Sequence, residues 1–332
     1  MDRPGLKVRF ALGVDGGGTK TLALVADPSG RVLGTGRAGS CDIYSNPRAA
    51  DEVERAVRAA LAQAGLVPES LAHATYSLAG ADWPEDFAFW QGELAARGLG
   101  RRIEVVNDAV GALCSGGEED AVIVVCGTGS ATGARNARTG AVWHSSFWQL
   151  TQGGGELSER ALQAIWRADL GIDPPTSLAE PVLRHLDAET PGELLHRFTR
   201  RKNRMAGTPS DLVPILFAQA QAGDGAARSI LVHHGRELAE HAAVAARKVG
   251  IIERPFALLL AGGVFRAAFP LFRESLLARL AELSAHALPK EHRFEPLRGA
   301  ALMALRGIGA AGEGVRAELD RTFPAPEFFH TG

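Results

Sequence analysis

The residues best suited to chemistry lie near the start of the chain, in the run Gly13-Val14-Asp15-Gly16-Gly17-Gly18-Thr19-Lys20-Thr21. Apolar residues on both sides predict a tight loop between two strands. Glycines let consecutive backbone N–H groups approach a bulky anion and form a concave nest for it. Because a carboxylate repels phosphate, Asp15 is expected to hold Mg²⁺ or its waters. Gly16, Gly17, Gly18 and Thr19 are the expected phosphate contacts, with Lys20 adding positive charge.

This loop differs from a Walker A motif, because Thr19 stands where that motif has its lysine and because the following segment is strand-like. For the loop taken alone, a glycine-rich hairpin turn without a ligand is the alternative interpretation.

Three more short segments follow expected strands further along the chain. Asn107-Asp108 comes after the strand expected at 103–106, Gly127-Thr128-Gly129-Ser130 after that at 121–125, and Gly262-Gly263 after that at 256–260. A carboxylate at a strand end beside a phosphate nest can accept the proton of an attacking hydroxyl, so Asp108 is the expected general base. Its alternative role is the N-cap of a helix beginning at 109.

The elements that position these segments follow one pattern twice. Residues 8–37 predict three antiparallel strands with a turn at 27–30, and 121–144 repeat a strand, glycine loop, strand, turn and strand. A helix is expected at 47–64, with Asn46 as its cap and Gly65 at its end. Strands that alternate with helices indicate an α/β fold, in which ligands bind outside the carboxyl ends of the strands. The repeat indicates duplicated halves, with the ligand in the cleft between them.

Composition limits the kinds of partner and the cellular compartment that we expect. The 332 residues are 46% apolar and 22% charged with a net charge of −2, which predicts neither nucleic acid nor an anionic membrane as partner. Three cysteines without paired spacing suggest a reducing compartment. The N-terminus shows no signal peptide, and no run reaches the ~18 apolar residues of a membrane span. We therefore expect a cytoplasmic protein.

The four segments together resemble the nucleotide-binding segments of the sugar-kinase, actin and heat-shock-ATPase superfamily. Over residues 10–306 the chain looks most like the BadF/BadG/BcrA/BcrD ATPase and N-acetylglucosamine kinase family. This resemblance implies two ribonuclease-H-like (actin-like ATPase) domains, 1–114 rejoined by a helix at about 296–310, and 115–295 with a helical insertion. It also implies that glycine loops in each domain hold the phosphates of ATP, with Gly262 and Gly263 under the adenosine and Asp108 as the base. The implied activity is ATP- and Mg²⁺-dependent phosphorylation of a sugar hydroxyl, with an amino sugar such as N-acetylglucosamine as acceptor.

The acceptor side departs from that family. Its kinases carry an acidic Gly-Asp-Glu-Gly-like segment, where this chain has Gln149-Leu150-Thr151-Gln152 and no carboxylate before Glu156. Gln149 and Gln152 are therefore candidate sugar contacts, as neutral amides. The further candidates are Asp42 and Asn46 in an altered first-domain loop, Asp82, and Asn107.

Two other functions remain open at this point. A BadF-type ATPase that drives a partner protein would need cysteines for a shared iron–sulfur cluster, and Cys41, Cys114 and Cys126 are scattered. A silent nucleotide or sugar sensor is the third reading. The helical second domain suggests a homodimer, and His233 and His234 are expected to face solvent or to serve helix packing.

Overall fold

The computed structural model describes residues 10–117, 119–145, 150–202, 205, 210–290 and 294–329. It has the predicted α/β architecture, with two mixed five-stranded sheets. The first sheet contains β1 (Phe10–Gly16), β2 (Thr21–Ala26), β3 (Val32–Ala38), β4 (Leu71–Leu78) and β5 (Ile103–Asn107). The second contains β6 (Ala121–Cys126), β7 (Ser130–Arg135), β8 (Val142–His144), β9 (Phe256–Ala261) and β10 (Ala287–Lys290).

The first sheet has the strand order β3-β2-β1-β4-β5. β1 pairs antiparallel with β2 and parallel with β4, and β4 pairs parallel with β5. The second sheet has the order β10-β9-β6-β7-β8, which is the same order read from the opposite end. The duplication expected from the sequence is therefore confirmed in the topology.

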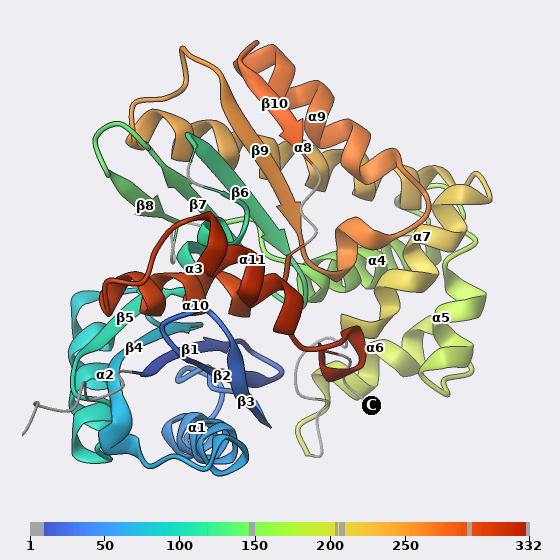
Figure 1. Cartoon of the computed structure of the whole chain (residues 1–332). Helices are drawn as coiled ribbons and strands as arrows, with labels where there is room; N and C mark the ends of the chain where they lie inside the picture. Colours follow the sequence, from blue (N-terminus) through green and yellow to red (C-terminus); the bar gives the residue numbers. More distant parts are fainter. Residues whose placement is uncertain are drawn as a thin grey trace, which may run out of the picture. The chain divides into compact units, whose positions relative to one another are not determined.

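Alternating side chains divide the core of the first sheet between its two faces. On one face, Leu12 and Val14 of β1 pack with Val53 and other residues of α1 (Ala49–Ala64), beside Trp90 of α2 (Pro84–Ala96). On the other, Ala11 packs with residues of α10 (Pro296–Gly307) and α11 (Glu313–Thr322). The two C-terminal helices therefore belong to the same hydrophobic core as the first strand (Figure 1).

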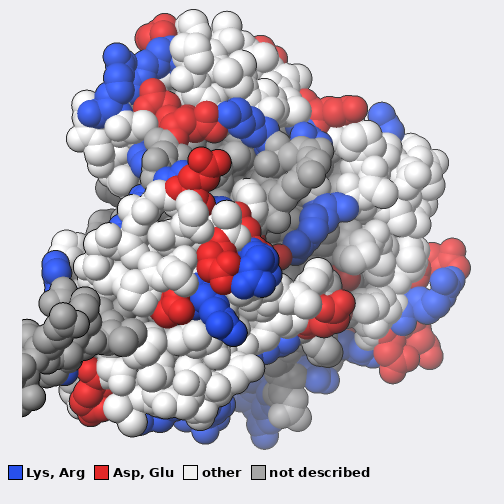
Figure 2. All heavy atoms as spheres, in the orientation of Figure 1, with Lys and Arg blue, Asp and Glu red and all other residues white. Residues whose placement is uncertain are grey.

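Helices supply most of the remaining chain. They are α3 (Asp108–Ser115), α4 (Gly154–Asp169), α5 (Ala179–His185), α6 (Pro191–Thr199), α7 (Val213–Gln221), α8 (Gly225–Lys248) and α9 (Leu271–Leu283), with 3₁₀ turns at Pro68–Ser70, Ser210–Leu212, Gly263–Arg266 and Pro326–Phe329. None of the helices described combines the length and apolar composition that a bilayer crossing requires. Acidic and basic side chains are interspersed on the face drawn in Figure 2.

The described chain divides into two compact units. One comprises residues 1–121, 133–147 and 292–332, and the other comprises 122–132 and 148–291. The boundaries expected from the sequence, 1–114 with the returning helix at about 296–310 and 115–295, stay a prediction.

Two local expectations need correction. The first helix begins at Ala49, not 47, and Asn46 does not cap it: Asn46 accepts the Arg48 N–H at 2.9 Å in a turn that precedes the helix. Its expected end is confirmed, because Gly65 adopts a left-handed conformation with φ 65°. Beyond α10 the chain forms α11 and a 3₁₀ turn that buries Phe329.

Candidate functional site

In the first unit, the candidate site lies at the carboxyl edge of the parallel strands. Gly16 at the end of β1 aligns with Leu78 of β4, and Leu78 aligns with Asn107 at the end of β5. Neighbouring strands lie ~4.8 Å apart, so the ends of β1 and β5 are separated by ~10 Å. This register places Asp15 and Asp108 at the same edge of the sheet.

The first glycine loop is the predicted tight loop between β1 and β2. The Gly17 N–H donates to the Lys20 carbonyl at 2.8 Å, and the Cys41 N–H donates to the Gly17 carbonyl at 3.1 Å. Gly18 and Thr19 are exposed at the tip, and a Cβ at Gly18 would meet no atom within 4 Å. The tip therefore has the open space that a bulky ligand needs.

Lys20 has a partner that the sequence did not indicate. Its ammonium donates to the carbonyl of Phe329, in the C-terminal 3₁₀ turn of the same unit. The lysine is thus held by the C-terminal segment in this structure, and contact with phosphate stays a prediction.

Asp15 lies in an acidic environment. Burial raises the pKa of its carboxyl to about 7, and the charges of Asp108 and Glu295 raise it further, against the opposing effect of Lys20. Glu295 immediately precedes α10. Sequence reasoning missed Glu295, because it lies 280 residues after Asp15 and belongs to none of the motifs. A partly buried set of carboxylates is the donor chemistry that a hard divalent cation requires.

Asp108 is the first residue of α3, but the cap of that helix is Asn107. Asn107 Oδ1 accepts the Ala109 N–H at 3.0 Å, so the alternative role given to Asp108 as the N-cap is wrong. Asp108 Oδ1 also accepts this N–H at 2.9 Å. Burial, together with the charges of Asp82 and Asp42, raises the pKa of Asp108 to about 6, although the Ala109 hydrogen bond opposes the rise.

Asn107 is buried, with 3% of its surface exposed, and both ends of its amide are engaged. Its Nδ2 donates to Asp82 Oδ1 at 2.9 Å and to the Ala81 carbonyl at 3.3 Å. Asn107 therefore links the start of α3 to the loop after β4, with Asp82 beside Asp108. A direct contact between Asn107 and a substrate stays a prediction.

Asp42 and Asn46 lie in the loop between β3 and α1 and order that loop. Asp42 accepts the Tyr44 N–H at 3.0 Å and the Ser45 hydroxyl at 2.8 Å. Asn46 Nδ2 donates to the Ser40 carbonyl at 2.6 Å. These bonds are those of an ordinary polar turn, and sugar binding by either residue stays a prediction.

Tyr44 and Asp86 are neighbours of this loop that the sequence did not single out. The Tyr44 hydroxyl donates to the carboxylate of Asp86, 3.0 Å from both oxygens, and Asp86 also accepts the Trp83 N–H at 2.8 Å. Asp86 is buried and fixes the start of α2. It accepts the cap N–H as the third residue of a capping box does, but Trp83 is not a capping residue type, so the sequence carried no signal for it.

In the second unit, the glycine loop between β6 and β7 is joined to the segment that leads into α4. The Gly154 N–H donates to the Gly127 carbonyl at 2.7 Å, and the Gly155 N–H donates to the Thr128 carbonyl at 3.2 Å. A Cβ at Gly153 would lie 2.1 Å from the Gly129 carbonyl oxygen. Only glycine permits this contact. We call residues 151–155 the pre-α4 segment.

Ser130 and Gly262, two further predicted nucleotide contacts, have structural partners in this unit. The Ser130 hydroxyl donates to the Thr151 carbonyl at 2.6 Å. Gly262 follows β9 with φ 97°, and a Cβ there would lie 2.3 Å from the Cys126 carbonyl oxygen. Close packing of β9 against the end of β6 therefore explains the glycine. A Cβ at Gly263 would meet nothing within 4 Å, so that position is open to a ligand.

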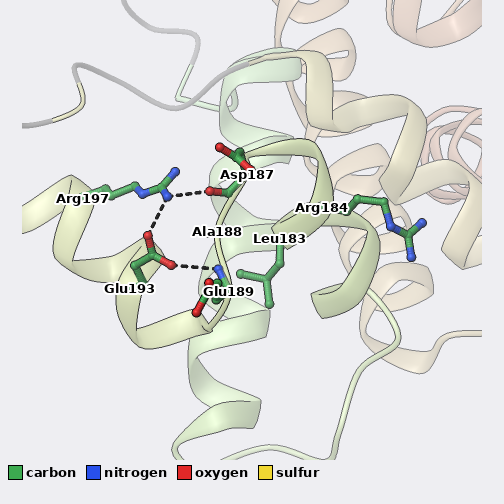
Figure 3. Close-up of a pocket in the computed structure, with 7 residues that line it drawn as sticks. All are labelled: Leu183, Arg184, Asp187, Ala188, Glu189, Glu193 and Arg197. Carbon is green, nitrogen blue, oxygen red and sulfur yellow. Dashed lines mark hydrogen bonds and ion pairs between the residues drawn. The ribbon is translucent and has the colours of Figure 1, made fainter.

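The remaining acceptor candidates are Gln152 and Gln149. Gln152 lies exposed in the pre-α4 segment, whereas Gln149 and the preceding Trp148 lie outside the described residues. The next residue in the chain, Leu150, is 83% exposed. A polar pocket at the end of α5 is a separate feature (Figure 3). Its Arg197 is bonded to Glu193 and to the Leu186 and Asp187 carbonyls. The pocket contains none of the predicted site residues.

The chain resembles known proteins over most of its length. The model of the BadF/BadG/BcrA/BcrD ATPase family matches residues 12–304. N-acetyl-D-glucosamine kinase of Dictyostelium discoideum is 27% identical over 314 residues, 89% of this chain and 97% of that protein. Glucosamine kinase GspK of Vibrio cholerae is 27% identical over 231 residues, 68% of this chain and 76% of that protein.

The fold has counterparts among solved structures. A protein of Chromobacterium violaceum assigned as an N-acetylglucosamine kinase superimposes with a TM-score of 0.67 at 23% identity, over 90% of this chain and 99% of that one. At this identity the likeness establishes the fold alone. The family match over residues 12–304 goes further. This chain belongs to the BadF/BadG/BcrA/BcrD ATPase family.

Proposed function

We propose that the protein is an ATP- and Mg²⁺-dependent kinase that transfers the γ-phosphate to a hydroxyl of an amino sugar, such as N-acetylglucosamine or glucosamine. The observation that carries the proposal is the position of Asp108, at the same sheet edge as the glycine loop that follows Asp15. The relatives named as amino-sugar kinases support the choice of acceptor.

Asp108 has the properties of a general base in this reaction. With a pKa of about 6 it is ionised at neutral pH, yet it is more basic than an ordinary carboxylate. The Ala109 N–H and the neighbouring cap of α3 fix its position. It would accept the proton of the sugar hydroxyl as that oxygen attacks the γ-phosphorus, and the ADP oxygen would leave with the bond's electron pair.

The residues around Asp15 fit a magnesium ion. Burial and the nearby charges of Asp108 and Glu295 make this carboxylate costly to ionise without a cation. Asp15 would hold the ion or its waters, and a bound Mg²⁺ would neutralise charge on the β- and γ-phosphates. In the same reading, the N–H groups of Gly17, Gly18 and Thr19 would bind the phosphates.

The second unit would contribute its own glycine loop at 127–130 to the phosphates, and Gly262-Gly263 to the adenosine. On the acceptor side, Asp82 and Asp42 are the carboxylates proposed to meet sugar hydroxyls, and Gln152 is the proposed neutral contact. We further propose that the protein acts in the cytoplasm, where ATP is available, as a homodimer.

The test is ADP release and sugar-phosphate formation with Mg²⁺-ATP, using N-acetylglucosamine, glucosamine, glucose and N-acetylmuramic acid as acceptors. One amino sugar should raise turnover far above the rate without acceptor, and Asp108→Asn should lower this turnover by about 10²–10⁴-fold. ADP binding should persist in the variant, which would show that the nucleotide site is intact.

Two results would redirect the proposal. If the protein hydrolyses ATP equally fast with and without every sugar, an ATPase that drives a partner becomes the better assignment. If it binds nucleotide without turnover, a nucleotide or sugar sensor becomes the better assignment. Full activity of Asp108→Asn would remove Asp108 as the base even if the kinase activity is found.

A further inference from the structure

Side chains from three elements hold Thr151 of the pre-α4 segment and its neighbour. The Thr151 carbonyl accepts the Ser130 hydroxyl of β7 at 2.6 Å, and its N–H donates to His241 Nε2 of α8 at 3.4 Å. At the next residue, the Gln152 N–H donates to Glu156 of α4 at 2.6 Å. Side chains thus form hydrogen bonds with consecutive backbone groups of a segment that has no regular secondary structure.

The fourth of these bonds comes from His234 of α8. Its Nε2 lies 2.8 Å from the Gln152 carbonyl oxygen. Because a carbonyl only accepts, Nε2 carries the proton and Nδ1 has the lone pair. Nδ1 is buried and has no hydrogen-bond partner among the described residues. A buried nitrogen without a hydrogen-bond partner costs folding free energy. An apolar side chain would avoid this cost, but it would leave the Gln152 carbonyl without the His234 donor.

The state of His234 suits a permanent donor. The ring is fully buried and lies 5.9 Å from the ring of Phe272. Burial and the charge of Arg160 lower its pKa to about 4, against the opposing effect of Glu156. The ring is therefore neutral at physiological pH. The expectation that both His233 and His234 face solvent or serve simple packing holds for His233 alone, which is 69% exposed.

Three residues of this group lie on one face of α8. His234, Glu237 and His241 are spaced by three and four residues, which places them on one side of the helix. Arg160 bridges Glu237 and Glu156 at 2.7 Å each. Although Glu156, His234 and Glu237 are close enough to bind a cation together, the guanidinium already neutralises both carboxylates. We therefore interpret these side chains as structural support for the pre-α4 segment. We call the four residues that bond to its backbone, Ser130, Glu156, His234 and His241, the brace.

The brace acts on the second glycine loop. The pre-α4 segment is hydrogen-bonded to the Gly127 and Thr128 carbonyls, and Gly153 packs on Gly129. A shift of Gln152 would therefore move the loop backbone. We propose that His234, aided by His241, is a positioning residue that holds the second glycine loop in the geometry that binds the nucleotide phosphates. This inference rests on the proposed function for the identity of the ligand.

The experiment compares His234→Leu with His234→Gln in the full-length protein. Leucine fills the space without a donor, whereas the glutamine amide can still donate to the Gln152 carbonyl. We expect His234→Leu to weaken ADP binding about tenfold in calorimetry, and His234→Gln to recover most of it. Arg247→Leu, at an exposed position of α8 outside this cluster, is the control and should bind ADP like the wild type.

Kinetics and stability then separate positioning from folding. If an amino sugar is phosphorylated, His234→Leu should raise KM for ATP while KM for the sugar stays within about twofold. A melting temperature lowered equally in both His234 variants, with ADP affinity unchanged in both, would overturn the proposal and leave a purely structural histidine.

The ADP measurement needs no acceptor. Failure of the proposed kinase activity is therefore distinguishable from failure of the brace, since the first appears in wild-type turnover and the second in variant affinity.

Discussion

Replacing Asp15 with asparagine should stabilise the nucleotide-free protein at neutral pH, although it removes the proposed metal ligand. Burial and the charges of Asp108 and Glu295 raise the pKa of Asp15 from 3.8 to about 7. A carboxyl whose pKa is raised by folding keeps its proton in the folded state after the unfolded chain has lost its own. The folded protein therefore loses stability as the pH rises from about 4 to about 7.

The size of the effect follows from that shift. A pKa that moves from 3.8 to about 7 corresponds to about 4 kcal/mol of unfolding free energy above pH 7. The charge of Asp108 adds to the free-energy cost of ionising Asp15, so the two titrations are coupled and their contributions cannot be added. The asparagine variant should be more stable than the wild type by a few kcal/mol at pH 8 and about equally stable at pH 4.

The assay is denaturant unfolding in the presence of a chelator, from pH 4 to pH 8, for the wild type and Asp15→Asn. Glu69→Gln, at an exposed carboxylate of the same unit, is the control and should follow the wild type at every pH. Adding Mg²⁺ and ADP should then stabilise the wild type more than the variant. An Asp15→Asn protein that is less stable than the wild type at pH 8 would refute the reasoning, because it would mean that a favourable partner holds the charge.

Three further outcomes test other parts of the site. The kcat/KM for the sugar should rise with pH and level off above about 6, as Asp108 ionises; a flat profile from pH 5 to 8 would contradict its role as base. Asn107→Ala should cost about 1–2 kcal/mol in denaturant unfolding, and Asn107→Asp should also destabilise the protein at neutral pH, because its carboxylate can cap α3 but repels Asp82. Gly262→Ala should lower the melting temperature, since its Cβ would lie 2.3 Å from the Cys126 carbonyl oxygen, whereas Gly263→Ala, with open space, should not.

The sequence predicted the parts of the fold that depend on local patterns. Glycine loops between strands and the strand repeat were readable because both are signals over a few residues, and they led to the fold and to Asp108. The cap of α3 was assigned one residue too late, since adjacent Asn107 and Asp108 are both good caps and only the backbone geometry decides between them.

Contacts between residues far apart in the chain could not be predicted from the sequence. Lys20 is bonded to the carbonyl of Phe329, 309 residues away, and a backbone acceptor leaves no mark in the sequence. His234 was indistinguishable from His233, because both occupy a helix and only the packing of α8 decides which is buried. Glu295 reaches Asp15 only because α10 returns to the first sheet.

The two units differ in the charge of the segments that we propose to bind ligands. In the first unit, burial and the neighbouring carboxylates raise the pKa values of Asp15 and Asp108, so that a bound cation is favoured. In the second unit, residues 151–155 carry no charged side chain, and neighbouring side chains hydrogen-bond to the backbone of Thr151 and Gln152. Because residues 151–155 carry no charged side chain, these hydrogen bonds are what orders the segment. For this reason we expect nucleotide affinity in this protein to depend more on the brace at His234 than on the identity of residue 152.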